Sequence, residues 1–252
     1  MHHFFVEPSA ITGERIYITG EDAFHIKNVL RMKEGDEISV SNNADNKEYR
    51  CGIEKIEQGS VECVLRFIKE ESGELSSPVS LYQGLPKGDK MEFIIQKAVE
   101  LGVSEIIPVA MKRCVVKLDE KREKSKLARW QQIAKSASEQ SRRPVIPQIL
   151  PVMSFDEALK RASQADVPLL PYEMADGFEK TSEIIDSIKP GNSVSVMIGP
   201  EGGFDLEEIK KAEDLGMNMI TLGKRILRTE TAGMVMLSIL MYESEKKTTG
   251  EG

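Results

Sequence analysis

From Val79 onward, short apolar runs alternate with longer stretches in which apolar side chains recur three and four positions apart. Residues 79–84 and 105–110 have the pattern of strands, and residues 90–101 between them have the pattern of a helix with one apolar face. Alternation of this kind is typical of a mostly parallel sheet that helices cover on both faces. The same patterns predict further strands at residues 167–170, 193–198 and 219–222 and further helices at residues 120–141, 155–165 and 230–244. The sequence therefore predicts an α/β fold for this part of the chain.

Residues 1–72 follow a different pattern. Short runs rich in β-branched residues, separated by Gly, Asn and Asp, stand at residues 15–18, 37–40, 48–56 and 60–67. Their spacing predicts a small β-barrel, which a helical stretch at residues 22–32 interrupts. Residues 70–78 are polar, contain Gly and Ser, and end at proline, as linkers between domains often do. We therefore expect two domains, residues 1–72 and residues 73–252.

The composition is that of an ordinary globular protein, with 40% hydrophobic and 30% charged residues. The longest apolar stretch, Met234 to Tyr242, is too short to span a bilayer, and the N-terminus lacks the features of a secretory signal. We therefore expect a cytoplasmic protein that does not contact a membrane. The three cysteines show no paired spacing and the three histidines do not cluster, so we expect no structural metal.

Charge is distributed unevenly along the chain. The net charge is −7, but the segment from Met111 to Arg143 holds eleven Lys or Arg residues and four acids, so it carries +7 and the remainder carries −14. A local basic surface on an acidic protein fits selective contact with phosphate groups. A solvated helix face whose charges pair in salt bridges would give the same pattern, and the sequence leaves both interpretations open.

Two glycine-containing loops stand near the C-terminus, at residues 198–204 and 222–232. Each follows a predicted strand and precedes a predicted helix, and their glycines are Gly199, Gly202, Gly203 and Gly223. Glycine allows a positive φ or a close approach of backbone to a ligand, and the amides at a helix start can donate to that ligand. Either loop alone could be a tight turn and nothing more. Together they predict a site for a small, flat, polar ligand such as a nucleotide-like cofactor.

The usual phosphate-binding motifs are absent from these loops. No Gly-x-Gly-x-x-Gly follows a strand, and there is no Walker lysine. A cofactor without phosphate groups is therefore favoured, and S-adenosylmethionine is our candidate. Leu222, Ile226 and Leu227 could form an apolar slot for its adenine ring.

The helices beside these loops have clear signals. Asp205 and Glu208 match a capping box, and Phe204 and Ile209 match the accompanying hydrophobic staple, so a helix should begin directly after the first loop. The last predicted helix, residues 230–244, is apolar almost all round. We expect such a helix to be buried by the sheet and by a further surface such as a second subunit.

Several motifs, taken in order, resemble those of one family. They are residues 25–31, 84–90, 96–102, 139–141, 199–203 and 222–232. In this combination the chain resembles the RsmE family, the 16S ribosomal RNA uridine N3-methyltransferases of the SPOUT class. The resemblance runs from the N-terminus to about Glu245.

The resemblance implies a fold, a reaction and partners. The fold would be an N-terminal PUA-like RNA-binding β-barrel followed by a SPOUT α/β domain with a deep trefoil knot. The reaction would be S-adenosylmethionine-dependent N3-methylation of a uridine near the 3′ end of 16S rRNA in the small ribosomal subunit. The protein would be a homodimer. Two positions depart from the family's usual pattern, because His3 stands where an arginine is common and Gly233 where proline is common.

Carried over onto this sequence, the resemblance places the knot loops at residues 169–173, 198–204 and 222–232. The cofactor-binding residues would be Leu170, Pro171, Ile198, Gly199, Pro200, Gly203, Leu222, Gly223, Ile226, Leu227, Arg228, Thr231 and Ala232. Backbone groups in these loops would hold the adenine and the ribose.

Arg228 and Glu230 are our candidate catalytic residues. The N3 atom of uridine is a poor nucleophile until its proton leaves, and the charge then spreads to the flanking carbonyl oxygens. Arg228 could stabilise that charge and Glu230 could orient or accept the proton. Alternatively, Arg228 forms a structural ion pair with Glu201 or with Glu230.

The candidate RNA contacts are His25, Lys27, Arg31, Arg142 and Arg143. Each could equally be an ordinary solvated side chain. An alternative function, a non-catalytic RNA-binding factor for ribosome assembly, would make the glycine loops purely structural. A nucleotide-dependent enzyme of another kind is disfavoured by the missing phosphate motifs.

Overall fold

The structure of the chain is a computed structural model that describes residues 1–69, 73–175 and 177–248. It contains two compact units, and each is described here by itself. The first comprises Met1–Glu74 and Ser138–Ile146, and the second comprises Leu75–Ala137 and Pro147–Gly252. Of the expected boundary segment, residues 70–78, residues 70–72 lie outside the described residues. The sequence patterns did not indicate that a segment near residue 140 belongs with the first unit.

The first unit is built on a six-stranded sheet with the order β1-β4-β5-β6-β3-β2. Its strands are β1 (His2–Phe5), β2 (Ile11–Thr12), β3 (Arg15–Thr19), β4 (Glu37–Ser41), β5 (Glu48–Ile56) and β6 (Ser60–Lys69). The four longer strands that the sequence predicts are confirmed. The edge strands β1 and β2 were not predicted, because runs of four and two residues are too short to show alternation.

The expected barrel needs a correction. The described strands form an open, curled sheet resembling half a barrel, since β1 and β2 stand at its two ends and do not pair with each other. The pairing of β5 with β6 shifts register at Arg50/Cys51 and at Ile53/Lys55, and bulges of this kind increase the local twist of a sheet. The core of the unit lies on one face of this sheet and includes Ile16, Ile18, Ile38 and Val40.

The helical stretch in the first unit is an α-helix that changes into a π-helix. The α-helix α1 (Gly20–Phe24) leads into a π-helical turn, His25–Val29. Ile26 is buried, whereas Val29 is 58% exposed. A π-turn has hydrogen bonds between residues five positions apart, so a residue three positions after Ile26 no longer shares its face.

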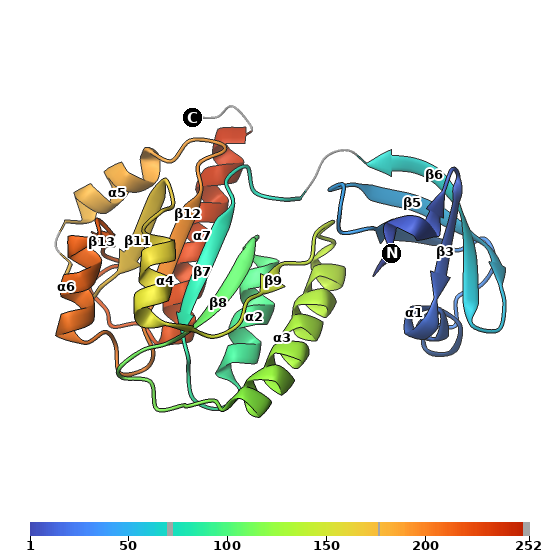
Figure 1. Cartoon of the computed structure of the whole chain (residues 1–252). Helices are drawn as coiled ribbons and strands as arrows, with labels where there is room; N and C mark the ends of the chain where they lie inside the picture. The colour runs from blue at the N-terminus through green and yellow to red at the C-terminus, as the bar shows by residue number, and fades with distance from the viewer. Residues whose placement is uncertain (70–72, 176, 249–252) are drawn as a thin grey trace. The chain divides into compact units, whose positions relative to one another are not determined.

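The second unit has the predicted α/β fold. Its sheet has the order β10-β8-β7-β12-β11-β13, with β9 beside β8, and all its strand pairs are parallel. The strands are β7 (Val79–Gly84), β8 (Glu105–Ala110), β9 (Gln148–Ile149), β10 (Met153–Ser154), β11 (Val167–Pro171), β12 (Val194–Ile198) and β13 (Asn218–Ile220). The helices are α2 (Lys90–Glu100), α3 (Glu120–Ser141), α4 (Phe155–Ala162), α5 (Phe178–Asp186), α6 (Leu206–Asp214) and α7 (Thr229–Thr248). Figure 1 shows α4 in front of the strands and α7 behind them.

The last helix, α7, packs against α2 and β12 and leaves part of its apolar surface uncovered. Met236, Leu237 and Leu240 are buried, whereas Met234, Val235, Ile239 and Met241 are only half-buried. Tyr242 is 65% exposed. None of the described helices combines the length and the hydropathy of a membrane-spanning segment.

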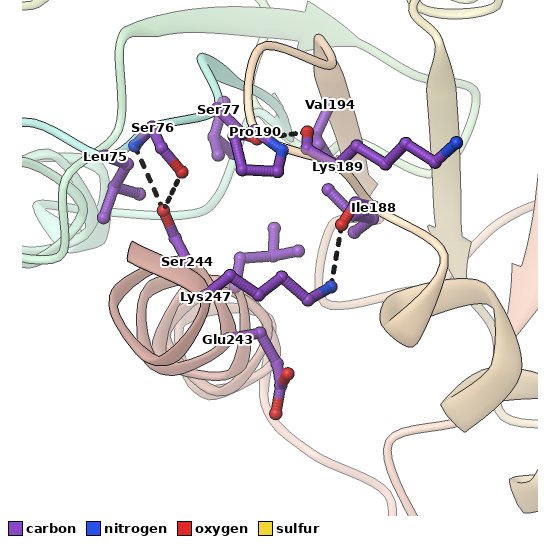
Figure 2. A pocket seen from close by; sticks show the side chains of 12 residues that line it. Leu75, Ser76, Ser77, Ile188, Lys189, Pro190, Val194, Glu243, Ser244 and Lys247 are labelled. Carbon is purple, nitrogen blue, oxygen red and sulfur yellow. Dashed lines mark hydrogen bonds between the residues drawn. The ribbon is translucent and has the colours of Figure 1, made fainter. Parts of the chain in front are cut away.

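The C-terminal half of α7 is fastened to its unit by polar contacts (Figure 2). The Ser76 amide donates to the Ser244 hydroxyl at 3.1 Å, and the Lys247 ammonium donates to the Ile188 carbonyl at 2.7 Å. Lys247 also donates to the carbonyl of Asp186, at the end of α5, at 2.9 Å. The cavity between these groups has a volume of about 20 Å³, which is room for about one water molecule, so this region is structural.

Candidate functional site

A cleft of about 570 Å³ opens in the second unit, at the carboxyl ends of three neighbouring strands. Its walls are residues 171–173 at the end of β11, residues 198–204 at the end of β12, and residues 221–223 and 225–229 after β13. In open parallel sheets the carboxyl ends of the strands are the usual place for a ligand. The fold therefore brings together three loops that are far apart in the sequence.

The loop after β12 lies close to the end of β7. A Cβ atom on Gly84 would lie 2.7 Å from the backbone nitrogen of Pro200, so only glycine fits there. Gly203, later in the loop, has a φ of +67°, which glycine adopts without strain. The predicted capping box is present, because Asp205 and Glu208 each accept a backbone hydrogen bond at the start of α6. Contacts with the rest of the unit thus fix both ends of the loop.

A buried hydrogen-bonded link holds the same loop to α7. Gln83 Nε2 donates to Thr229 Oγ1 at 2.8 Å, and Thr229 Oγ1 donates to the Gly199 carbonyl at 2.6 Å. Gln83 is fully buried and Thr229 is 5% exposed. Sequence reasoning missed both residues. The sequence contained a signal for Gln83, because a glutamine at the end of an apolar strand is expected to be buried and a buried amide needs a hydrogen-bond partner.

Lys90, at the start of α2, bridges two carboxylates at the edge of the cleft. Its Nζ atom lies 3.1 Å from Glu201 Oε1 and 3.3 Å from Glu230 Oε2. The hydrogen bond to Glu201 raises the pKa of Lys90, so the lysine stays charged. Burial raises the pKa of Glu201, but hydrogen bonds from the Lys87 amide and from Lys90 outweigh it and hold that pKa below its usual range. Glu201 is therefore an ionised anchor of the loop.

This bridge decides between two interpretations of Arg228. The carboxylates of Glu201 and Glu230 are bound by Lys90 and not by Arg228. Arg228 is exposed, lines the cleft, and makes no ion pair or side-chain hydrogen bond within the described residues. Its guanidinium group is therefore available to a ligand.

Most of the expected cofactor-binding residues line the cleft. They are Pro171, Ile198, Gly199, Pro200, Gly203, Leu222, Gly223, Ile226, Leu227, Arg228 and Ala232. Leu170 and Thr231 do not line it, and Leu170 is fully buried in the core beneath. Lys90, Arg113, Tyr172 and Glu173 line the cleft but were not among the expected site residues. All four follow the carboxyl ends of sheet strands, Lys90 after β7, Arg113 after β8, and Tyr172 and Glu173 after β11, which is the signal that could have found them.

The loop after β13 supplies apolar surface. Leu222 and Leu227 are half-buried, and Ile226 is 83% exposed. Gly223 has a φ of +112°, a conformation that other residues rarely adopt. An apolar wall beside backbone amides can hold a flat heteroaromatic ring by packing and by backbone hydrogen bonds.

Part of the basic segment from residue 111 to residue 143 is neutralised inside the second unit. Lys112 lies 3.0 Å from Asp205, and Arg129 lies 2.5 Å from Glu92. Salt bridges therefore account for Lys112 and Arg129. Contact with phosphate groups remains an interpretation only for the other cations of this segment.

Arg143 requires a correction. It was expected to contact RNA phosphates, but it is only 4% exposed and its Nε atom donates to Glu74 Oε1 at 2.9 Å. A buried guanidinium in this position cannot reach a phosphate. The sequence could not distinguish it from its neighbour Arg142, which is exposed.

The other expected RNA contacts lie on the surface of the first unit. His25, Lys27 and Arg31 are exposed on and after the π-helical turn. Arg31 and Arg142 have φ angles of 53° and 58°, in the left-handed region that arginine rarely occupies. Residues held in this conformation are often found at functional sites.

Comparison with known proteins agrees with this geometry. Residues 73–241 match the family described as RNA methyltransferase domain, and residues 18–66 match the RNA methyltransferase PUA domain. The chain is 39% identical over 97% of its length to ribosomal RNA small subunit methyltransferase E of Bacillus subtilis, of which it covers 98%.

Two solved structures are similar over nearly the whole chain. One is a ribosomal RNA small subunit methyltransferase E from Neisseria gonorrhoeae bound to S-adenosylmethionine, with 31% identity, a TM-score of 0.84, and coverage of 96% of this chain and 97% of that one. The other is a methyltransferase from Legionella pneumophila in complex with the same cofactor, with 32% identity, a TM-score of 0.82, and coverage of 95% and 96%. The sequence motifs, the fold, the loops at the strand ends and these matches lead to one conclusion: the chain belongs to the ribosomal RNA small subunit methyltransferase E family, the RsmE family of RNA methyltransferases.

Proposed function

We propose that this protein transfers a methyl group from S-adenosylmethionine to N3 of a uridine near the 3′ end of 16S rRNA, in the small ribosomal subunit. The observation that carries the proposal is the cleft at the ends of β11, β12 and β13. The guanidinium of Arg228, which has no ion pair among the described residues, lies at its wall. Two similar structures were solved with S-adenosylmethionine. The relatives' common name identifies their substrate as small-subunit ribosomal RNA.

The residues of the cleft fit the cofactor. Leu222, Ile226 and Leu227 offer an apolar surface to the adenine, and the backbone of residues 198–204 offers donors and acceptors to its polar edge. The cleft contains no Walker lysine or phosphate-binding fingerprint, which suits a cofactor without phosphates. When bound, the cofactor supplies an activated methyl group on its sulfonium.

Arg228 and Glu230 are the residues that we propose for the chemistry at the base. As the N3 proton leaves, negative charge develops on the two carbonyl oxygens beside it, and Arg228 donates hydrogen bonds to them. Glu230 is the candidate for orienting or accepting the proton. Lys90 holds the carboxylate of Glu230 at the edge of the cleft, 3.3 Å from its own ammonium group, and so fixes its position.

The first unit supplies contacts to the RNA. His25, Lys27, Arg31 and Arg142 are exposed on it and reach phosphate groups of the rRNA. In our account, residues 1–72 are the PUA-like RNA-binding domain and residues 73–252 are the SPOUT methyltransferase domain.

The second unit is proposed to contain a trefoil knot and to form a homodimer. The knot is proposed from the family resemblance, and the strand order is compatible with it, because β13 lies beyond β11 while α7 returns to contact α2 and β12. The half-buried apolar side chains of α7 support the dimer, since a second copy would cover them. A ribosomal RNA substrate is consistent with the cytoplasmic location that the sequence led us to expect.

Isothermal titration calorimetry with S-adenosylmethionine tests this proposal against a non-catalytic assembly factor. We expect saturable heat with one cofactor bound per chain, and displacement by S-adenosylhomocysteine. Absence of binding by the folded protein would leave the glycine loops with a purely structural role and would remove the proposal.

A further inference from the structure

A second polar pocket, of about 260 Å³, lies in the first unit. Residues from β5, the end of β6 and the segment after α3 line it. All of its lining residues belong to the first unit, and none of them lines the cofactor cleft.

The pocket has an excess of positive charge. The cations Arg50, Lys69 and Arg142 and the carboxylate of Glu48 line it. Glu48 Oε1 lies 3.0 Å from Arg50 Nε, so these two charges largely neutralise each other. Lys69 and Arg142 are exposed and form no ion pair within the residues that the structure describes. Two cations therefore remain available to an anion.

The walls of the pocket are held in place by buried or short contacts. Asn43 Oδ1 accepts a hydrogen bond from the Ile146 amide at 2.6 Å, which ties the loop before β5 to the segment after α3. Directly beside Arg142, the buried side chain of Arg143 donates to Glu74 at 2.9 Å. The position of Arg142 is thus set by the fold of its unit.

Arg142 itself occupies an unusual backbone position. It directly follows the end of α3 and has a φ of 58°, where glycine or asparagine is the usual residue. An arginine kept in a conformation that disfavours it is a reason to look for a use of its side chain. Arg142 lines the pocket, so its side chain can contact an anion bound there.

The size and the lining of the pocket favour a phosphate over a base or a free cofactor. Its volume is below the roughly 300–1,000 Å³ of typical small-molecule sites. No aromatic side chain is among its lining residues, so it offers no stacking surface for a base. Two cations beside small polar groups suit one phosphate and its adjoining sugar.

We infer that this pocket binds a phosphate group of the RNA backbone, and that Lys69 and Arg142 are its cationic contacts. The inference rests on the proposed function, which supplies the RNA. It adds a specific, sequence-independent anchor point and assigns a role to Lys69.

Substitution of Arg142 by glycine gives a sharp test, because glycine relieves the backbone conformation while it removes the charge. The full chain is assayed by filter binding to isolated small ribosomal subunits over a range of KCl concentrations. We expect the slope of log Kobs against log salt to become smaller by roughly 0.7–0.9, the amount for one phosphate, in Lys69→Ala/Arg142→Gly, and by part of that amount in Arg142→Gly alone. Lys160→Ala removes an exposed charge from α4 and should keep the wild-type slope.

The affinity for S-adenosylmethionine and the Tm are measured in parallel. Both should be retained in Arg142→Gly, and Arg142→Asn provides a second variant whose side chain tolerates the same backbone conformation. An unchanged salt slope in both variants would overturn the inference. A second outcome would also overturn it. Inorganic phosphate at constant ionic strength could raise the Tm of the wild type but not that of Arg142→Gly, while the salt slope for RNA binding is the same in both proteins.

The two proposals fail separately. If the wild-type protein methylates the subunit while the variants keep its salt slope, the inference of a phosphate-binding pocket fails and the proposed function stands. If the slope falls in the variants but the wild type transfers no methyl group, the RNA contact stands and the proposed function does not.

Discussion

Gln83 at the end of β7 donates a hydrogen bond of 2.8 Å to Thr229 at the start of α7, a residue 146 positions later in the chain. The Thr229 hydroxyl in turn donates a hydrogen bond to the Gly199 carbonyl at 2.6 Å. The end of one strand, the glycine loop after another strand, and the last helix are therefore joined through one buried hydroxyl group. The geometry of the cofactor cleft depends on that group.

Replacement of Thr229 by valine should weaken cofactor binding. Valine keeps the shape of the side chain but removes the donor to the part-buried Gly199 carbonyl and leaves Gln83 Nε2 with its bond to the Gly84 carbonyl alone, at a cost of about 1–3 kcal/mol. If about half of that cost falls on the loop, the affinity for S-adenosylmethionine drops roughly two- to tenfold. Calorimetry measures this drop, and Thr229→Ser, which keeps the hydroxyl group, should bind nearly as the wild type does. Equal affinity in the valine variant would show that the link does not position the loop.

Replacement of Arg228 by alanine should remove activity and spare binding. The guanidinium is proposed to act on charge that develops during the reaction, and loss of one such donor typically costs about 10²–10³ in rate. The cofactor is expected to be held by backbone groups of the loops, so its affinity should stay within about twofold of wild type. Single-turnover methyl transfer and calorimetry are compared in the same preparation. Lys224→Ala, an exposed residue in the same loop, is the control and should retain its rate.

His3 should make the first unit sensitive to acid. Burial lowers the pKa of His3 from 6.5 to about 4; Glu48 opposes this shift, and the charges of Arg50 and Arg142 add to it. Its Nδ1 atom lies 2.9 Å from Ser39 Oγ. Between pH 6.5 and about 4 the unfolded chain therefore binds a proton that the folded chain does not, and the free energy of unfolding should decrease as the pH falls through this range.

The size of the effect follows from the two pKa values and is at most about 3 kcal/mol. Urea unfolding of the full chain at several pH values measures it. His3→Asn keeps a polar group near Ser39 but does not titrate, so its unfolding free energy should depend less on pH. Identical pH dependence in the two proteins would refute the role given to His3.

Disruption of the uncovered face of α7 should separate the proposed dimer. Ile239 is half-buried and Tyr242 is 65% exposed in the single chain. A charge at either position would be buried without a partner if a second copy packs there. Light scattering coupled to gel filtration should give twice the mass of the chain for the wild type and a smaller mass for Ile239→Asp. Leu215→Glu changes an exposed apolar residue at the end of α6 and should remain a dimer.

Elements with a strong local signal could be predicted closely from the sequence. The helix α3, Glu120–Ser141, and the strand β8, Glu105–Ala110, have the bounds that their patterns indicate. The start of α6 after Asp205 follows from a capping box, which is a purely local signal. Elements of two residues, such as β9 and β10, carry no period, and they form because they pair with β8.

Contacts between distant residues could not be predicted in the same way. The link from Gln83 to Thr229 and the bridge from Lys90 to Glu230 depend on which strands become neighbours. Arg143 is buried with Glu74 as its hydrogen-bond partner, and Glu74 stands 69 positions earlier in the chain. The resemblance to a family identified the loops of the cleft, but the side chains that fix those loops became visible only in the fold.

The most direct test of the account is transfer of a labelled methyl group from S-adenosylmethionine to isolated small ribosomal subunits, followed by mass spectrometry of the digested RNA. The account predicts label in 3-methyluridine at one position near the 3′ end of 16S rRNA, and labelling roughly 10²–10³-fold slower with Arg228→Ala. Label on the ribose or on another base, or cofactor binding by the wild type with no transfer to the subunit, would contradict it.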